Sequence, residues 1–249
     1  MGARRREEIC TVYKSGCLLL TATDITSRPV TEKTECNMKA LIIGATGATG
    51  KDLLNLLLND PDYTRVIIFV RRRSGIAHSK LEEVLTDFEK PEAIADRIQG
   101  DVLFCLLGTT MKEAGSKEIQ RHIDYEIPIN FITVARRKGV PKIVLLSAYG
   151  ASVASRVFYM TLKGELEDGI RNLAFDLFIT FRPGLLLRKN TDRLGERISA
   201  PIIKFLNSIG IWRKFRPLPT SVLAEKMARA PKIFSAGIHV LELGKILEF

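Results

Sequence analysis

Tyr159 and Lys163 are residues whose types and spacing could transfer a proton. They lie four residues apart in a segment with a helical pattern, so their side chains would project from one face of the same helix. From there the phenol could protonate a carbonyl oxygen as a hydride arrives, and the ammonium of Lys163 would favour the ionised phenol. Ser147 follows the apolar run KIVLL and could hydrogen-bond the same oxygen. These three side chains predict a site for carbonyl reduction by hydride transfer.

The Tyr-x-x-x-Lys spacing is weak evidence when taken alone. Five tyrosines and 17 lysines in a chain of 249 residues make a chance pair a real alternative. Tyr149 is a rival acid, but Val153 occupies the position four residues after it, so Tyr149 has no lysine partner at helical spacing. Position favours Tyr159, because it follows a predicted strand, and open parallel sheets bind ligands at the carboxyl ends of their strands.

The segment MKALIIGATGATG, residues 38–50, has the features of a phosphate-binding turn. An apolar strand pattern precedes three evenly spaced glycines, and a leucine-rich helical pattern follows them. Glycines allow a tight turn, a close approach of the backbone to a pyrophosphate and close helix packing, while the helix N-terminus offers free N–H groups. No Lys-Ser or Lys-Thr pair follows, which disfavours a nucleoside-triphosphatase loop and leaves a merely structural turn as the alternative. The predicted cofactor-binding residues here are Gly44, Thr46, Gly47, Ala48, Thr49 and Gly50.

The end of the second predicted strand indicates which dinucleotide would bind. NAD enzymes place an Asp or Glu there for the ribose 2′-hydroxyl, whereas an Arg pairs with the 2′-phosphate of NADP. In this chain the strand RVIIFV runs directly into Arg71, Arg72 and Arg73, with no acid. Charge-assisted contacts from Arg71 and Arg72 therefore predict NADP(H) as the cofactor, and an exposed basic turn is the alternative.

From Lys39 onward, strand-like and helix-like patterns alternate, which predicts an α/β fold. The strand patterns are nearly continuous apolar runs, as in a parallel sheet covered by helices on both faces. We therefore expect a doubly wound parallel sheet in a single domain, residues 38–249. Within it, residues 184–249 lose the alternation and are predicted to form a small substrate-side annex. Residues 1–37 show no periodicity and are interpreted as a disordered or non-native extension that precedes the natural start.

The composition disfavours several other classes of protein. With 46% apolar and 27% charged residues the chain is typical of a globular protein, and no apolar run approaches the roughly 20 residues of a membrane span. The net charge of +10 would suit a polyanion, but no nucleic-acid-binding motif accompanies it. Four cysteines are too few for a disulfide scaffold, and the three histidines lack metal-ligand spacing. We expect a cytoplasmic protein with a small-molecule substrate and no metal, nucleic-acid or membrane partner; a homo-oligomer stays open.

These motifs together resemble the short-chain dehydrogenase/reductase superfamily. The stretches IIGATGATGKDLL, FVRRR, FCLLGTT, LLSAYGA, FYMTLKGELE and FRPGLLL are similar to its atypical branch, which contains the Tat-interacting oxidoreductase and its bacterial relatives. The likeness covers nearly everything from Met38 on, and it implies a Rossmann-type fold that binds NADPH. The turn FRPG should close over the nicotinamide through Pro183, unless it is a plain strand-ending turn. The resemblance adds these cofactor-binding residues: Leu106, Leu107, Gly108, Tyr159 and Lys163.

The chain departs from this branch after the fifth predicted strand. Members often have a second serine where this chain has Ala148, which leaves Ser147 as the candidate at that strand end. Some members act mainly as cofactor-dependent regulatory or binding proteins. An NADP(H)-binding redox sensor or scaffold with little turnover is therefore the alternative to an NADPH-dependent oxidoreductase. A sugar-nucleotide epimerase is a weaker alternative, because that group usually uses NAD.

Overall fold

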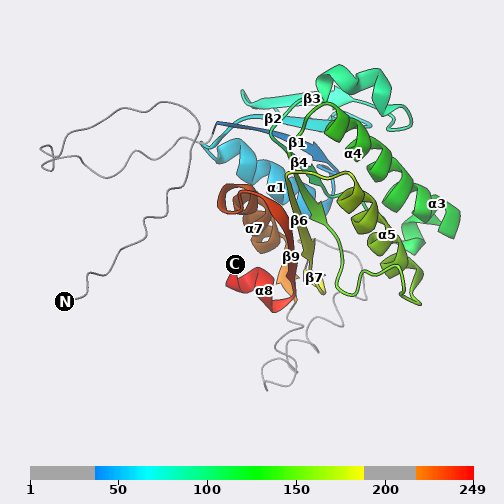
Figure 1. The fold of residues 1–249 in the computed structure, drawn as a ribbon. Helices are drawn as coiled ribbons and strands as arrows, with labels where there is room; N and C mark the ends of the chain where they lie inside the picture. The colour runs from blue at the N-terminus through cyan, green and yellow to red at the C-terminus, as the bar shows by residue number, and fades with distance from the viewer. Residues whose placement is uncertain (1–36, 188–216) are drawn as a thin grey trace, which may run out of the picture. The chain divides into compact units, whose positions relative to one another are not determined.

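The computed structural model describes residues 37–187 and 217–249, which form a sheet with helices on both faces (Figure 1). The sheet has seven strands in the order β3-β2-β1-β4-β5-β6-β9, and every neighbouring pair is parallel. The chain builds outward from β1 in both directions, so the predicted doubly wound, Rossmann-type fold is confirmed. The strands are β1 (Met38–Ile43), β2 (Tyr63–Val70), β3 (Leu81–Leu85), β4 (Val102–Cys105), β5 (Lys142–Leu146), β6 (Leu177–Arg182) and β9 (Gly237–Glu242).

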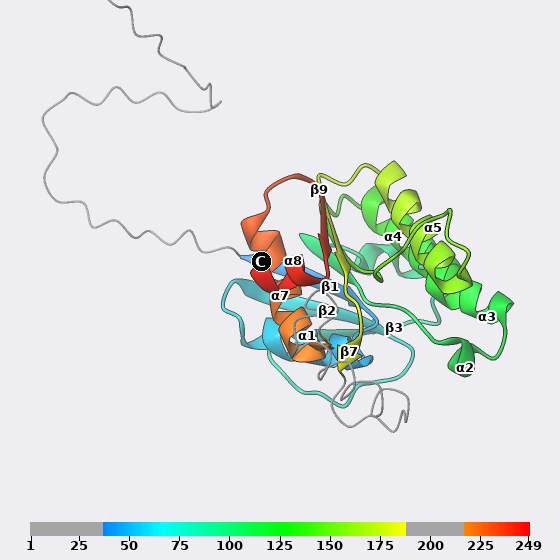
Figure 2. The same cartoon turned by 90° about the horizontal axis from the view of Figure 1, so that it is seen from below.

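Two pairs of long helices cover the two faces of the sheet (Figure 2). One face packs against α1 (Ala48–Asn59) and α7 (Thr220–Ile233), and the other packs against α4 (Ile127–Arg137) and α5 (Phe158–Asn172). The shorter elements are a 3₁₀ helix (Pro91–Arg97), α2 (Met111–Ala114), α3 (Lys117–Arg121), a π-helical turn (His122–Glu126), α8 (Gly244–Glu248), and the two-residue strands β7 (Leu186–Leu187) and β8 (Leu218–Pro219).

The central strands are apolar on both faces because each face supports its own core. Along β1, Ala40 and Ile42 pack in the core on the α1 and α7 side, while Leu41 and Ile43 pack in the core on the α4 and α5 side. Successive side chains of a strand point to opposite faces, so a strand covered twice is apolar at every position. This double coverage explains why the strands at the centre were recognisable as continuous apolar runs.

The end of the chain adds a strand that the sequence analysis did not predict. α7 crosses over the sheet, and β9 then pairs in parallel with β6 as the last strand at that edge. The positions along β9 are exposed or half-buried, so its sequence GIHVLE lacks the continuous apolar run of a central strand. α7 packs on the sheet and β9 is one of its strands, and the substrate-side annex expected for residues 184–249 stays a prediction. Residues 188–216 of that segment, and residues 1–36 of the predicted extension, lie outside the described residues.

Candidate functional site

A cavity of about 710 Å³ lies at the carboxyl ends of β1, β4 and β5, where the order in which the chain adds strands to the sheet reverses. Parallel strands end at the same edge, so the loops that follow them meet there even though they are far apart in the sequence. The start of α5 and residues 184–186 complete the wall of the cavity. Ten of the predicted site residues line it: Gly47, Ala48, Thr49, Gly50, Leu106, Leu107, Gly108, Ser147, Tyr159 and Lys163.

The other predicted site residues are not among those that line this cavity. Gly44 and Thr46 belong to the turn between β1 and α1. Arg71 and Arg72 are exposed directly after β2, and within the described residues neither forms an ion pair. Pro183 is buried after β6, where its carbonyl accepts a hydrogen bond from the N–H of Tyr149 at 2.9 Å.

The three glycines of the turn differ in what the fold requires of them. Gly44 has a φ of +86°, and a Cβ there would lie 2.6 Å from the carbonyl carbon of Leu106. A Cβ on Gly50 would lie 2.1 Å from the carbonyl oxygen of Gly44. Gly47 has a φ of −71°, and its nearest contact would be an ordinary 3.4 Å. The fold itself therefore explains Gly44 and Gly50, whereas packing does not require a glycine at position 47, which lines the cavity.

The N-terminus of α1 is free to receive an anion. Gly47 is the N-cap residue, no side chain caps the helix, and its first turn carries no acidic residue. Ala48, Thr49 and Gly50 of this first turn line the cavity. The orphan N–H groups and the positive end of the helix dipole favour a phosphate at this place. The residues present thus fit the pyrophosphate of a dinucleotide.

Lys163 lies deep in the site, beside Tyr159. Its side chain is only 2% exposed, and its Nζ donates a hydrogen bond to the carbonyl of Leu107 at 3.2 Å and lies 5.7 Å from the centre of the Tyr159 ring. Burial acts to lower the pKa of Lys163, but its electrostatic interactions with the surrounding ionisable groups together outweigh burial, so the pKa lies above its ordinary value. These groups are Tyr159, Asp124, Cys105 and Glu167. The lysine therefore stays an ammonium ion at neutral pH.

Asp124 is a buried carboxyl group near Lys163 that the sequence analysis missed. A Cβ at Gly108 would lie 3.3 Å from Lys163 Nζ and 3.8 Å from Asp124 Oδ1, so both side chains face this glycine. Asp124 Oδ1 accepts the N–H of Thr109 at 2.6 Å, and burial raises the pKa of Asp124 although Lys163 and this N–H oppose the shift. The sequence carries no signal for it, because Asp124 lies on a π-helical turn within a longer helical pattern.

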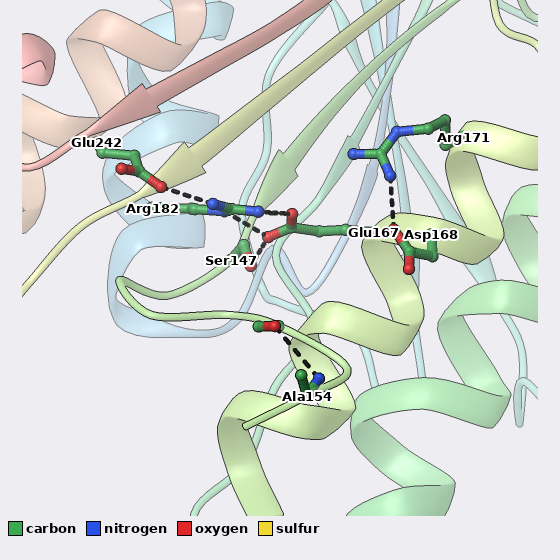
Figure 3. Close-up of polar contacts among 8 residues, drawn as sticks. Ser147, Ala154, Glu167, Asp168, Arg171, Arg182 and Glu242 are labelled. Carbon is green, nitrogen blue, oxygen red and sulfur yellow. Dashed lines mark hydrogen bonds and ion pairs between the residues drawn. The ribbon is translucent and has the colours of Figure 1, made fainter. Parts of the chain in front are cut away.

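Ser147 lines the cavity, but its hydroxyl points to a buried carboxylate (Figure 3). Ser147 Oγ donates to Oε1 of Glu167 at 2.5 Å, and Arg182 contacts both oxygens of Glu167. The sequence analysis expected Ser147 to donate a hydrogen bond to a substrate carbonyl oxygen. In the structure the single hydroxyl proton of Ser147 is already used in the hydrogen bond to Glu167. The sequence analysis missed Glu167 and Arg182, although Glu167 continues the four-residue spacing of Tyr159 and Lys163 along α5.

Comparison with known proteins identifies the family. Residues 44–195 match the model of a family described as NAD(P)H-binding. The chain belongs to this NAD(P)H-binding family. Rat Protein HTATIP2 is 32% identical over 213 residues, which cover 83% of this chain and 86% of the rat protein. A Candida albicans relative, "Protein FMP52, mitochondrial", is 35% identical over 186 residues, which cover 71% of this chain and 77% of that protein. The resemblance to the Tat-interacting branch is therefore confirmed.

Solved structures share the fold of this NAD(P)H-binding chain. The Bordetella bronchiseptica enzyme WbmH, in complex with NAD⁺, has a TM-score of 0.61 at 17% identity, covering 83% of this chain and 76% of WbmH. The Lactococcus lactis oxidoreductase ylbE has a TM-score of 0.61 at 17% identity, covering 85% of this chain and 95% of ylbE. Identities this low support the fold alone.

Proposed function

We propose that this protein is an NADPH-dependent oxidoreductase that reduces the carbonyl group of a small organic substrate. The observation that carries the proposal is that Tyr159 and Lys163 line the same cavity as the uncapped N-terminus of α1. A dinucleotide with its pyrophosphate on α1 would extend along the carboxyl ends of the strands toward Tyr159.

Each side chain then has a defined task. The bound cofactor supplies the hydride. Tyr159 donates the proton to the carbonyl oxygen, which prevents negative charge from accumulating there. Lys163 is tied to the carbonyl of Leu107 and holds a positive charge beside Tyr159, so it stabilises the phenolate that remains after proton transfer.

The preference for NADPH over NADH rests on the exposed arginines after β2. Replacing both (Arg71→Ala/Arg72→Ala) is expected to weaken NADPH binding by about 10–100-fold, because charge-assisted hydrogen bonds to the 2′-phosphate are lost. NADH binding should stay unchanged, since NADH has no 2′-phosphate. Fluorescence titration with each nucleotide measures both dissociation constants.

A suitable control is Arg65→Ala, which removes an exposed arginine from the opposite end of the same strand, where it pairs with Glu82. This variant should keep the wild-type preference. Equal binding of NADPH and NADH by the wild type would contradict the choice of NADP(H).

A second candidate function is an NADP(H)-binding redox sensor or scaffold with little turnover. The hydrogen bond from Ser147 to Glu167 favours it, because a carbonyl in the cavity then has one proton donor fewer. A pull-down with NADP⁺, with NADPH and without cofactor tests it, and an identical set of partners in all three would argue against this function.

We also propose a cytoplasmic location. Burial raises the pKa of the Cys105 thiol to about 11, so this cysteine suits a reducing compartment as an inert core residue. Among the described residues, no helix is long and apolar enough to cross a bilayer. The yeast relatives are named mitochondrial, which makes the mitochondrion the competing location. Fractionation of cells that express the full chain would distinguish the two.

A further inference from the structure

The carboxylate of Glu167 is buried behind the cavity wall and is surrounded by hydrogen-bond donors (Figure 3). Its Oε1 accepts from Ser147 Oγ at 2.5 Å and from Arg182 Nε at 3.0 Å, and its Oε2 accepts from Arg182 Nη2 at 2.5 Å. Arg182 is held in turn by Glu242, its register partner on β9, through a contact of 2.6 Å from Nη1. The network joins α5 to the ends of β5, β6 and β9.

This network determines the hydrogen-bonding polarity of Ser147. A carboxylate that pairs with a guanidinium is purely an acceptor, so the hydroxyl must be the donor in its contact with Glu167. A serine hydroxyl has one proton and two lone pairs. Glu167 accepts the hydrogen bond that this proton makes. Because Glu167 is only 2% exposed, no water can take the place of the serine as its donor. Only lone pairs of Ser147 are then left to face the cavity.

We infer that Glu167, held by Arg182, makes Ser147 a hydrogen-bond acceptor toward the cavity, and that the substrate carries a hydroxyl or N–H donor beside its reacting carbonyl. This inference rests on the proposed carbonyl reduction. Tyr159 protonates the carbonyl oxygen, and Ser147 receives the neighbouring donor. Glu167 is thus a positioning residue that selects hydroxy- or amino-carbonyl compounds over carbonyl compounds whose neighbouring group is only an acceptor.

Two ketones that differ only in whether the neighbouring oxygen carries a hydrogen or a methyl group test this selectivity. 2-Hydroxyacetophenone offers a donor beside the carbonyl, whereas 2-methoxyacetophenone offers the same oxygen without its proton. With NADPH as the cofactor, the measured quantity is the ratio of kcat/KM for the hydroxyketone to kcat/KM for the methoxyketone. This ratio should be about ten-fold higher in the wild type than in Ser147→Ala, as expected for one hydrogen bond. Ser147→Ala reports any preference that arises from size alone.

Glu167→Gln should reverse the selectivity. Arg182 has only donors, so it retains the amide oxygen and leaves the amide N–H₂ facing Ser147. Ser147 then accepts from Gln and turns its own proton into the cavity, where it favours the methoxyketone. The matched control is Glu165→Gln, which alters a carboxylate of α5 that pairs with Arg121 instead and should keep the wild-type ratio. Equal ratios in the wild type, Ser147→Ala and Glu167→Gln would overturn the inference.

Neutron diffraction from deuterium-exchanged crystals gives a readout that needs no turnover. The inference requires deuterium on Ser147 Oγ directed at Glu167 in the wild type, and deuterium directed into the cavity in Glu167→Gln. Deuterium directed into the cavity in the wild type would refute it. Should the wild type bind NADPH but reduce neither ketone, the proposed reduction fails, and the neutron map still decides the polarity of Ser147.

Discussion

Replacing Tyr159 with phenylalanine is expected to lower kcat for carbonyl reduction by about 10²–10⁴-fold, the usual contribution of a positioned acid. The variant keeps the ring that lies 5.7 Å from Lys163 Nζ and loses only the hydroxyl. Packing and cofactor binding should therefore be nearly unchanged, because the glycine turn proposed to hold the pyrophosphate precedes α1, whereas Tyr159 belongs to α5. Steady-state oxidation of NADPH and a fluorescence titration separate the two effects.

Tyr149→Phe is the matched control for this substitution. Tyr149 is the rival acid, and its backbone N–H holds the carbonyl of Pro183, so a phenylalanine there keeps that contact. Turnover should persist in this variant. If Tyr149→Phe is inactive while Tyr159→Phe turns over normally, the acid has been assigned to the wrong tyrosine. If Tyr159→Phe alone is unchanged, Tyr159 is not the proton donor.

The second large effect is expected from two alanine substitutions in the glycine turn, which should fail in different ways. Gly50→Ala should lower the free energy of unfolding by about 3 kcal/mol, because its Cβ would lie 2.1 Å from the backbone oxygen of Gly44, which cannot move cheaply. Gly47→Ala should cost less than about 1 kcal/mol, since it changes only an N-cap residue with an ordinary φ. Its methyl group should nevertheless weaken NADPH binding by at least about ten-fold, because it would enter the space for the pyrophosphate.

Urea unfolding without nucleotide measures the stability of both variants, and titration with NADPH measures binding by the folded protein. Comparing the two variants distinguishes a glycine that packing requires, Gly50, from a glycine that ligand binding requires, Gly47. Wild-type affinity in a stable Gly47→Ala protein would mean that no phosphate approaches this residue, and the cofactor position would have to be revised. Wild-type stability of Gly50→Ala would contradict the backbone contact.

Local sequence patterns were sufficient for the fold because most of its elements satisfy local rules. β1, β2, β4, β5 and β6 are apolar at nearly every position, since both faces of the sheet are covered. β9 was not predicted because it lies at the edge of the sheet. Its positions are exposed or half-buried there, so its sequence is not a continuous apolar run. Its place beside β6 depends on the crossover of α7, and no local pattern encodes that pairing.

The candidate site divides in the same way. The spacing of Tyr159 and Lys163 on one helix, and the three glycines between a strand and a helix, could be read directly because their geometry is local. The roles of individual glycines could not, because they depend on how closely Leu106 approaches Gly44 from the end of β4, and on how closely the turn brings Gly44 to Gly50.

By itself, the sequence determined the alternating α/β order, the glycine turn between a strand and a helix, and the Tyr–Lys face of α5, because each follows from short-range patterns of residue type. Tertiary structure alone decided which way the hydroxyl of Ser147 points. Its proton is taken by a carboxylate 20 residues away, which is held by an arginine 15 residues further on. That arginine is held in turn by a glutamate 60 residues beyond it. Hydrogen-bond polarity in a buried network is set by every donor and acceptor that the fold brings together, and no short stretch of sequence contains them all.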